Sequence, residues 1–457
     1  MNRLFGTDGV RGVANQLLTP ELAISLARAA AAVLAPEGGR AIIGRDSRNS
    51  GPMLEAALAS GFASAGLDVC LADVIPTPAI SFLIKDERAH LGAVISASHN
   101  PPEDNGIKFF DRRGMKLTMD QEMEIERALE RASPPARAVG RLTLLEAAAT
   151  RYAAFLTGAI DVEQIDLSGT SIVVDCAYGA TATIAPRVLR HLGAAIIPLH
   201  ATLDGDRINQ DCGSTHLEPV TAAVLERDAD LGIAFDGDGD RVMLVAADGT
   251  AIDGDRMIGI AAAHAHEHGR LSPAAVVTTV MSNLGLERWL ATRGIEMVRT
   301  PVGDRFVSHM MHERRIQVGG EASGHIIFSD FSPTGDGILT AVKLLEIAHE
   351  RHASLGDLAA SITLYPQIHR TIPCKNPRQI ETHQALRRAI VKEESALGER
   401  GRIVVRASGT QPILRLMVES EDESLCGEVV GRLAATAHQA IGYSSASASS
   451  NGYFNMG

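Results

Sequence analysis

One pattern recurs three times along the chain, and it constrains the fold more than any other feature of the sequence. Each copy starts with a short apolar strand, at residues 41–43, 172–174 and 275–277, and continues into a polar turn and a helical stretch. The helix stops at a glycine, and a second apolar strand follows (Gly66, Gly193 and Gly294). A strand, a helix and a strand joined by short links form a βαβ unit, which builds a parallel sheet. The sequence therefore predicts an α/β fold with three repeated βαβ-type domains.

The second half of each repeat consists of two further apolar strands that bracket a loop rich in reactive side chains. The loops read Ser-Ala-Ser-His-Asn between 91–95 and 107–110, Asp-Gly-Asp-Gly-Asp-Arg between 231–235 and 242–245, and Gly-Gly-Glu-Ala-Ser-Gly-His between 317–318 and 326–328. Binding groups of α/β domains gather in loops at strand ends. Three polar loops at matched positions therefore favour one shared cleft over three independent hairpin turns, and they predict mixed sheets.

The repeat stops near residue 365. The remaining sequence predicts a helix over 383–392 and strands over 402–406 and 413–418, which indicates a smaller α+β domain. The run of small polar residues from Gly442 onward cannot bury a core, so we expect a disordered tail over 442–457. We place the four domains around a central cleft, at 1–150, 151–252, 253–364 and 365–441.

The balance of residues narrows the class of protein. Hydrophobic residues make up 45% and charged residues 21% of the 457 residues, as expected of globular material with real cores. The net charge of −12 argues against nucleic acid as a partner, because phosphate backbones attract basic surfaces. The apolar stretch after Thr19 and Pro20 contains Arg28 and opens like an amphipathic helix, so we expect no membrane span. A chemically dense motif already starts at Phe5, so we expect no signal peptide. Five cysteines without a Cys-x-x-Cys pair suit a reducing compartment, and we expect a cytoplasmic protein.

The acidic loop is the strongest local signal. Asp236, Asp238 and Asp240 alternate with glycines, which lets a tight turn point several hard oxygens at one divalent cation. An EF-hand does not fit, because its sixth position would be Arg241 instead of glycine and its twelfth Ala247 instead of glutamate. With three protein oxygens, Mg²⁺ would keep positions open for a phosphate oxygen.

The serine loop carries a candidate nucleophile at the corresponding place one repeat earlier. Ser98 is followed by His99 and Asn100, so the hydroxyl has adjacent polar support. Alone, such a segment would be an ordinary turn; beside a metal loop it becomes a candidate for covalent catalysis. A Ser-His-Asp hydrolase is less attractive, since the sequence has no Gly-x-Ser-x-Gly elbow.

The other two polar segments suit a phosphorylated sugar. Glu321, Ser323 and His325 offer an acceptor, a hydroxyl and an imidazole that fit sugar hydroxyls, although a plain polar hairpin also explains them. Near the end of the chain, guanidinium groups, hydroxyls and flexible amides gather in a pattern that fits a phosphate dianion, with a hairpin bearing exposed arginines as the alternative. The residues of that second group are Arg406, Ser408, Gly409, Thr410 and Arg415.

Taken in order, and with the Thr-Asp-Gly-Val-Arg-Gly segment that ends at Gly12, these motifs resemble the phosphohexomutase superfamily over nearly the whole chain to about Ile441. Several stretches are similar to its bacterial branch that acts on glucosamine phosphates (Ser96 to Asn100, Cys212 to His216, Thr279 to Gly285, Val302 to Arg305). The chain departs from that branch at Ala322, Ala407 and Gln411, where glutamine, lysine and glutamate are usual.

The resemblance implies four domains around a central cleft and the conversion of glucosamine 6-phosphate into glucosamine 1-phosphate through a 1,6-bisphosphate. This product feeds UDP-N-acetylglucosamine and bacterial cell-wall synthesis. It implies a phosphoserine at Ser98 and magnesium held by the serine phosphate and the three aspartates of the acidic loop. It also implies sugar contacts at Glu321 and Ser323, and a distal phosphate held by the segment from Ser408 to Arg415.

For the mechanism we expect Arg11 and Arg241 to stabilise the transferring phosphoryl group, with His99 beside the nucleophile. Lys108 either exchanges the proton of the sugar hydroxyl or is a strand lysine that extends toward solvent, and the sequence favours neither. Arg305, His325 and Arg406 complete the expected substrate contacts. The expected partners are a small phosphorylated sugar, a bisphosphate or kinase that primes the serine, and a second copy of the chain in a homodimer.

Two alternatives stay open from the sequence. A phosphomannomutase or phosphoglucomutase would share everything except the sugar contacts. A catalytically silent sensor of sugar phosphates could use the acidic loop and the phosphate site without turnover.

Overall fold

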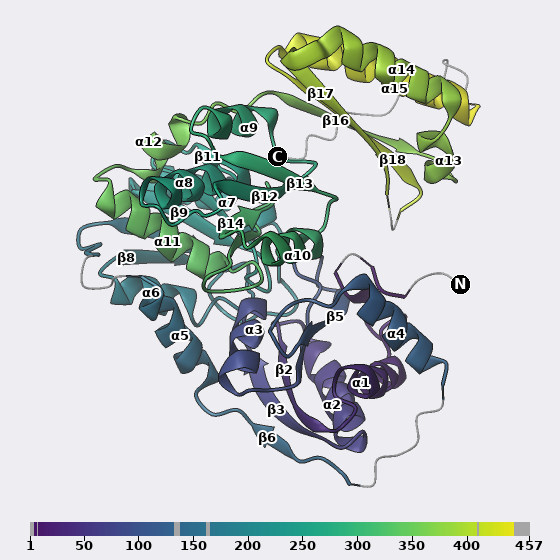
Figure 1. Cartoon of the computed structure of the whole chain (residues 1–457). Helices are drawn as coiled ribbons and strands as arrows, with labels where there is room; N and C mark the ends of the chain where they lie inside the picture. The colour runs from purple at the N-terminus through teal and green to yellow at the C-terminus, as the bar shows by residue number, and fades with distance from the viewer. Residues whose placement is uncertain (1–3, 7, 132–137, 161–164, 409–410, 443–457) are drawn as a thin grey trace. The chain divides into compact units, whose positions relative to one another are not determined.

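The computed structural model describes residues 4–6, 8–131, 138–160, 165–408 and 411–442 (Figure 1). The chain forms two compact units, one of residues 1–279 with 297–361 and the other of residues 280–296 with 362–457. The expected tail after Gly442 and the predicted phosphate ligands Gly409 and Thr410 lie outside the described residues.

The first sheet of the larger unit has the strand order β1-β5-β4-β2-β3-β6. Its strands are β1 (Val10–Val13), β2 (Gly39–Arg45), β3 (Leu67–Val74), β4 (Leu91–Ile95), β5 (Asp104–Asp111) and β6 (Leu142–Leu144). Strand β2 pairs in parallel with β3 and β4, whereas β5 runs antiparallel to both β4 and β1. The sheet is therefore mixed, as the repeat predicts.

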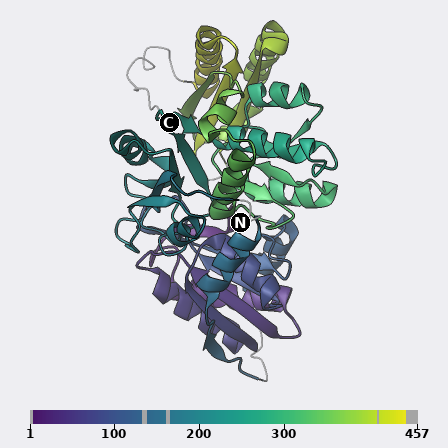
Figure 2. The ribbon, with the colours of Figure 1, turned by 90° about the vertical axis from the view of Figure 1, so that its left-hand side faces the viewer.

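Helices cover both faces of this sheet. They are α1 (Pro20–Leu34), α2 (Gly51–Ser64), α3 (Thr77–Asp86) and α4 (Met119–Leu129). Ala41 and Ile43 point into one core with α1 and α2, while a Cβ built on the next residue, Gly44, would meet Ile80 of α3 at 2.6 Å. Because successive strand residues point to opposite faces, α3 lies across the sheet from α1 and α2. Figures 1 and 2 show this purple layer of helices and strands from two sides.

The second and third sheets repeat the plan. The second has the order β11-β10-β9-β7-β8, and the third β13-β12-β14-β15. Their strands are β7 (Ser171–Asp175), β8 (Ala195–Leu199), β9 (Leu231–Phe235), β10 (Val242–Ala246), β11 (Ala251–Ile252), β12 (Ala275–Thr279), β13 (Glu296–Thr300), β14 (Val318–Gly320) and β15 (Ile326–Phe328). Their helices in this unit are α5 (Ala148–Gly158), α6 (Ala185–His191), α7 (Glu218–Arg227), α8 (Gly254–Glu267), α10 (Asp304–Arg314), α11 (Gly337–Glu350) and α12 (Leu355–Ala360).

In each of the three sheets an antiparallel hairpin carries the polar loop that the sequence singled out. The hairpins are β4 with β5, β9 with β10, and β14 with β15. The predicted threefold repetition of mixed α/β domains is confirmed. The predicted helix after Thr19 is also confirmed, since the Thr19 hydroxyl accepts from the Leu22 amide at 3.3 Å and starts α1.

The smaller unit has a three-stranded antiparallel sheet in the order β16-β18-β17. Its elements are α9 (Leu284–Ala291), β16 (Gln367–Pro373), α13 (Pro377–Glu381), α14 (Gln384–Leu397), β17 (Gly401–Ala407), β18 (Ile413–Ser420) and α15 (Glu423–Ile441). One core joins the strands to α14 and α15 through buried residues such as Leu386, Leu414 and Leu433. The predicted α+β domain is confirmed, whereas β16 and α15 were not anticipated.

Two expectations from composition can be compared with the described residues. All five cysteines are free and buried, which agrees with the absence of paired thiol motifs. No helix within the described ranges combines the length and the apolar composition that a membrane-spanning helix needs.

Candidate active site

Ser98 lies in the loop that follows β4, and the structure brings it to the acidic loop of the second sheet. Its side chain is 1% exposed, and its Oγ donates to Oδ2 of Asp236 at 2.5 Å. Its φ of 53° places it in the left-handed region, which a non-glycine residue adopts only when its surroundings hold it there. His99 Nδ1 lies 3.4 Å from the same Oγ, and burial, followed by the charges of Arg241 and Arg11, lowers the pKa of His99 to about 3. The imidazole is therefore neutral at physiological pH.

The three aspartates of the acidic loop converge. Asp236, Asp238 and Asp240 are at most 2% exposed, and each offers an oxygen within 4.8 Å of the others. Burial, followed by the charges of the other two carboxylates, raises the pKa of Asp236 well above its usual range. One oxygen each of Asp238 and Asp240 is buried and has no hydrogen-bond partner within the described parts of the chain. Buried carboxylate oxygens left in this state fit a site built for a divalent cation.

Lys108, on β5, is the cation nearest to these aspartates. Its Nζ lies 2.8 Å from Asp238 Oδ2, 3.0 Å from Asp8 Oδ2 and 3.5 Å from Asp240 Oδ2, and the side chain is 1% exposed. Burial alone would lower the pKa of Lys108, but the three carboxylates outweigh it and raise that pKa above its ordinary value. The lysine is therefore protonated, and its ammonium is enclosed among acids instead of reaching solvent.

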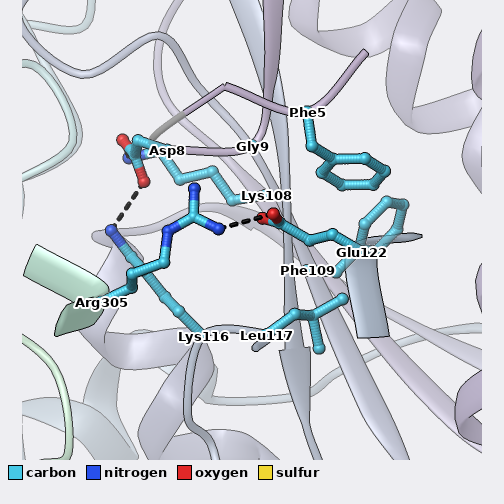
Figure 3. Close-up of a pocket in the computed structure, with 9 residues that line it drawn as sticks. All are labelled: Phe5, Asp8, Gly9, Lys108, Phe109, Lys116, Leu117, Glu122 and Arg305. Carbon is cyan, nitrogen blue, oxygen red and sulfur yellow. Dashed lines mark hydrogen bonds and ion pairs between the residues drawn. The ribbon is translucent and has the colours of Figure 1, made fainter. Parts of the chain in front are cut away.

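Three charged residues complete a network that the sequence did not reveal. Lys116 Nζ lies 2.7 Å from Asp8 Oδ1 (Figure 3). The same Nζ forms an ion pair with Asp304 at the start of α10. Nε2 of His325 lies 3.3 Å from the same Asp304 carboxylate. Asp8 and Asp304 stand inside recognisable motifs, but Lys116 belongs to none, and only the fold shows that it is buried between them.

Two arginines lie close to the serine loop: Arg11, which precedes it in the sequence, and Arg241, which follows it. Arg11 pairs with Asp8 and donates to Asn100 Oδ1 at 3.2 Å, while Nε of Arg241 lies 3.9 Å from Asp240 Oδ1. Burial would lower the pKa of both guanidinium groups, but neighbouring carboxylates raise it. Both cations act on the charge state of His99, the neighbour of Ser98, and Arg11 also bonds to Asn100 in the same loop.

Arg305 has a different setting from the one expected of a substrate ligand. It is 4% exposed, and its Nη1 donates to Glu122 Oε2 at 2.5 Å (Figure 3). Its Nη2 donates to the carbonyl oxygen of Gly6. These partners belong to α4 and the N-terminal segment. The geometry favours an ion pair that ties α10 to the first domain over direct contact with substrate.

The third polar loop lies against the second sheet. A Cβ built on Gly324, whose φ is +88°, would come within 2.0 Å of the Val242 carbonyl oxygen, so only glycine allows this approach. Oε1 of Glu321 accepts from the Gly303 amide at 3.3 Å, Ser323 is exposed, and His325 is 1% exposed. The sugar-recognition candidates thus adjoin the acidic loop, with Ser323 open to solvent.

In the smaller unit, the antiparallel register places Arg406 on β17 directly opposite Arg415 on β18. The Gln411 amide donates to Ser408 Oγ at 3.2 Å, and Arg415 Nη2 lies 3.4 Å from Gln411 Oε1. Like charges directly across a sheet repel each other, and an anion between them would relieve that repulsion. This hairpin tip therefore suits a phosphate group.

Comparisons with known proteins agree with this arrangement. The chain matches all four parts of the phosphoglucomutase/phosphomannomutase family: α/β/α domains I, II and III over residues 2–135, 150–249 and 253–365, and the C-terminal domain over residues 371–436. A phosphoglucosamine mutase of Desulforudis audaxviator is 47% identical over 440 residues, which cover 95% of this chain and 97% of that protein. The chain belongs to the phosphoglucosamine mutase family.

Solved structures show that the phosphoglucosamine mutase family shares its fold with other phosphohexomutases. A phosphoglucomutase/phosphomannomutase family protein of Burkholderia thailandensis superposes with a TM-score of 0.81 at 26% identity, covering 96% of this chain and 98% of that one. The N-acetylphosphoglucosamine mutase of Aspergillus fumigatus, solved with GlcNAc-6P and magnesium, has a TM-score of 0.67 at 17% identity, and 96% of each chain is covered.

Proposed function

We propose that this chain interconverts glucosamine 6-phosphate and glucosamine 1-phosphate through a phosphoserine at Ser98 and a 1,6-bisphosphate intermediate. The reaction makes it an isomerase that transfers a phosphoryl group within one sugar, and its product supplies UDP-N-acetylglucosamine for cell-wall synthesis. Membership in the phosphoglucosamine mutase family supports this substrate. The observation that carries the chemistry is the buried Ser98 hydroxyl bonded to Asp236 of the acidic loop, whose Asp238 pairs with Lys108.

In the proposed cycle, O1 of glucosamine 6-phosphate attacks the phosphorus on Ser98. The bond between that phosphorus and Oγ breaks, a bond to O1 forms, and the hydroxyl proton of O1 passes to Oγ, with neutral His99 as the relay, so that Ser98 is left as a free hydroxyl. The bisphosphate then turns within the site so that the phosphoryl group on O6 faces Ser98. The serine Oγ takes this group back, and glucosamine 1-phosphate leaves. Phosphoryl transfer of this kind depends mainly on positioning and on stabilising charge.

The residues around Ser98 divide these tasks. We assign Arg11 and Arg241 to the developing charge on the transferring phosphoryl oxygens, since their neighbours keep both of them cationic. Lys108 is protonated in this setting, so it can give a proton or a hydrogen bond to the sugar oxygen but cannot take a proton from it. Neutral His99, 3.4 Å from Oγ, can accept or relay the serine proton.

Magnesium fits the acidic loop because the unpartnered oxygens of Asp238 and Asp240 and the carboxylate of Asp236 form a hard-oxygen set of three. We propose that these residues, with the phosphate on Ser98, hold it. When bound, magnesium would neutralise charge on the phosphoryl group.

We also propose that the domains, at residues 1–150, 151–252, 253–364 and 365–441, divide recognition of the substrate. Glu321 and Ser323 would contact the sugar, and His325 would support them through Asp304. Arg406, Ser408, Gly409, Thr410 and Arg415 would hold whichever phosphate is not reacting.

A mutase assay with glucosamine 6-phosphate, magnesium and a trace of sugar bisphosphate tests the proposal, together with intact-mass detection of one phosphate on Ser98. Glucose 6-phosphate and mannose 6-phosphate are run under the same priming. We expect the highest kcat/KM for the glucosamine compound. A tenfold preference for another sugar, about 1.4 kcal/mol in transition-state binding, would transfer the assignment to that sugar. A protein that never carries phosphate and never turns over would contradict the mechanism itself.

A further inference from the structure

We propose that Arg48 and Asn209 are positioning residues that hold the backbone of the Ser98 loop, and thereby the phosphoserine oxygen, in the geometry that both transfer steps need. The inference rests on the proposed function, because it concerns how Ser98 acts. Arg48 lies in the turn between β2 and α2 of the first domain, and Asn209 lies in the second domain between β8 and α7.

Arg48 is completely buried, and its guanidinium is used almost entirely on one loop. Its Nη2 donates to the carbonyl oxygens of Ser98 at 3.0 Å and Asn100 at 2.7 Å. Its Nη1 donates to the carbonyl oxygens of Pro101 and, at 2.9 Å, Asp104. One planar cation therefore fixes four carbonyl groups along seven residues of chain, which no uncharged side chain could do.

Asp46 sets the position of that guanidinium. Its Oδ2 accepts from Arg48 Nε at 2.9 Å and from the Ser96 hydroxyl at 2.6 Å. Ser96 Oγ in turn accepts from the Ser98 amide at 2.8 Å. The loop is thus held through the amide as well as the carbonyl of Ser98.

Asn209 reaches the same carbonyl groups from the neighbouring domain. Its Nδ2 lies 2.8 Å from Ser98 O and 3.1 Å from Asn100 O. A Cβ built on Gly237, inside the acidic loop, would lie 2.8 Å from both Asn209 Nδ2 and Ser98 O. The back of the serine loop therefore packs directly on the acidic loop, and Asn209 fixes the distance between them.

These hydrogen bonds to the backbone of Ser98, from Arg48, Ser96 and Asn209, explain how Ser98 keeps a φ of 53°. A strained backbone persists only where its surroundings determine it. Since C=O and N–H point in opposite directions across a planar trans peptide, holding the Ser98 carbonyl on Arg48 turns the His99 amide away from Arg48. The loop carbonyls, which would repel a phosphate, are directed into the protein.

The test uses full-length Arg48→Lys and Asn209→Gly variants, with Arg45→Met as the matched control. Lysine keeps the charge of Arg48 but cannot bridge several carbonyl groups, and glycine at 209 accepts the φ of 61° while losing only the amide. Arg45 is an arginine three residues earlier that pairs with Glu55 and Asp73 instead of the serine loop.

We expect kcat to fall about a hundredfold in Arg48→Lys and at least tenfold in Asn209→Gly, since displacing a reacting group by about 1 Å can cost a hundredfold. KM for the sugar phosphate should stay within about threefold of the parent value. The rate at which a sugar bisphosphate phosphorylates Ser98, followed by intact mass, should fall in proportion to kcat. Arg45→Met should stay within twofold of the parent in both measurements.

A folded variant with kcat within twofold of the parent, or a loss confined to KM, would overturn the proposal. Should Arg48→Lys fail to fold, Asn209→Gly decides alone. Each variant is compared with a parent protein that catalyses the mutase reaction. The proposal for Arg48 and Asn209 can therefore fail while the proposed function stands. A parent without turnover would instead defeat the proposed function.

Discussion

Replacing Lys108 by methionine tests the electrostatics of the acidic loop directly. The lysine is 1% exposed, and its ammonium lies within 3.5 Å of Asp8, Asp238 and Asp240. Methionine fills a similar volume without charge, so the variant leaves three buried carboxylates without their nearest cation. Removing one partner of a buried ion pair costs about 3–5 kcal/mol.

The expected loss in melting temperature follows from that range. The acidic loop belongs to the larger unit, residues 1–279 with 297–361. At an unfolding entropy of about 2.1 cal/mol/K per residue, 1 kcal/mol corresponds to roughly 1.4 °C for a unit of this size, so it should melt about 4–7 °C lower in chelator. Added magnesium should recover a large part of this loss, because a divalent cation supplies the positive charge that the lysine gave. Mutase activity should remain low even when stability returns.

The assay is differential scanning calorimetry of the unphosphorylated protein in chelator and in magnesium, with the exposed Lys85→Met as control. The decisive quantity is the difference in melting temperature between chelator and magnesium for each variant. If Lys108→Met melts with the parent in chelator, or loses the same amount with and without magnesium, then the acidic loop does not depend on this lysine for charge.

Four further outcomes can be checked. Ser98→Ala should abolish turnover and leave no phosphate detectable by mass, because the covalent carrier is missing; near-normal activity would refute the role. Asp238→Asn should raise the magnesium concentration needed for half-maximal activity, and the parent should lose activity in chelator; unchanged activity in chelator would remove the metal from the scheme. Arg415→Ala should raise KM for sugar phosphates roughly ten- to a hundredfold while phosphorylation of Ser98 changes less, and an equal loss in both would place Arg415 at the reacting centre. Burial raises the pKa of Asp336 to about 6, so the stability that this residue contributes to the folded state is complete below about pH 4 and is lost as pH rises through 6. Asp336→Asn keeps an acceptor for the Tyr152 hydroxyl and cannot ionise, so it should raise the melting temperature more at pH 8 than at pH 5.

The sequence predicts the repeated architecture well, because each repeat shows local patterns of apolar strands and polar loops. The strands around Ile43, Val174 and Val277 are short apolar runs, and the loops between the later strands stand out by their polarity. Strand β1 was missed for the opposite reason. It has four residues without alternation, and it exists because Val10 pairs with Ile107, almost a hundred residues away.

The candidate site was predicted as far as its residues occur in motifs. Ser98 and the acidic loop were found through spacing and resemblance, but the network around Lys116 was not. A lysine becomes a buried cation only when the fold brings Asp8 and Asp304 to it, and no local pattern records such a distant arrangement. The same holds for Arg48, whose importance lies in the carbonyl groups that it reaches and not in its neighbours in the sequence.

The smaller unit is assembled from two separate pieces of chain, and this affects how it can form. Residues 280–296, with α9, are synthesised before the larger unit is complete and well before the strands of the smaller sheet. Arg288 of α9 donates to the Tyr365 hydroxyl and to Glu421, each at 2.6 Å, and Asn283 holds the backbone of Tyr365. During synthesis on the ribosome, α9 therefore emerges well before Tyr365 and Glu421, the residues that it contacts. A fragment that begins at residue 362 would keep the core of the smaller sheet but lack these contacts, so we expect it to be less stable than the same residues in the full chain.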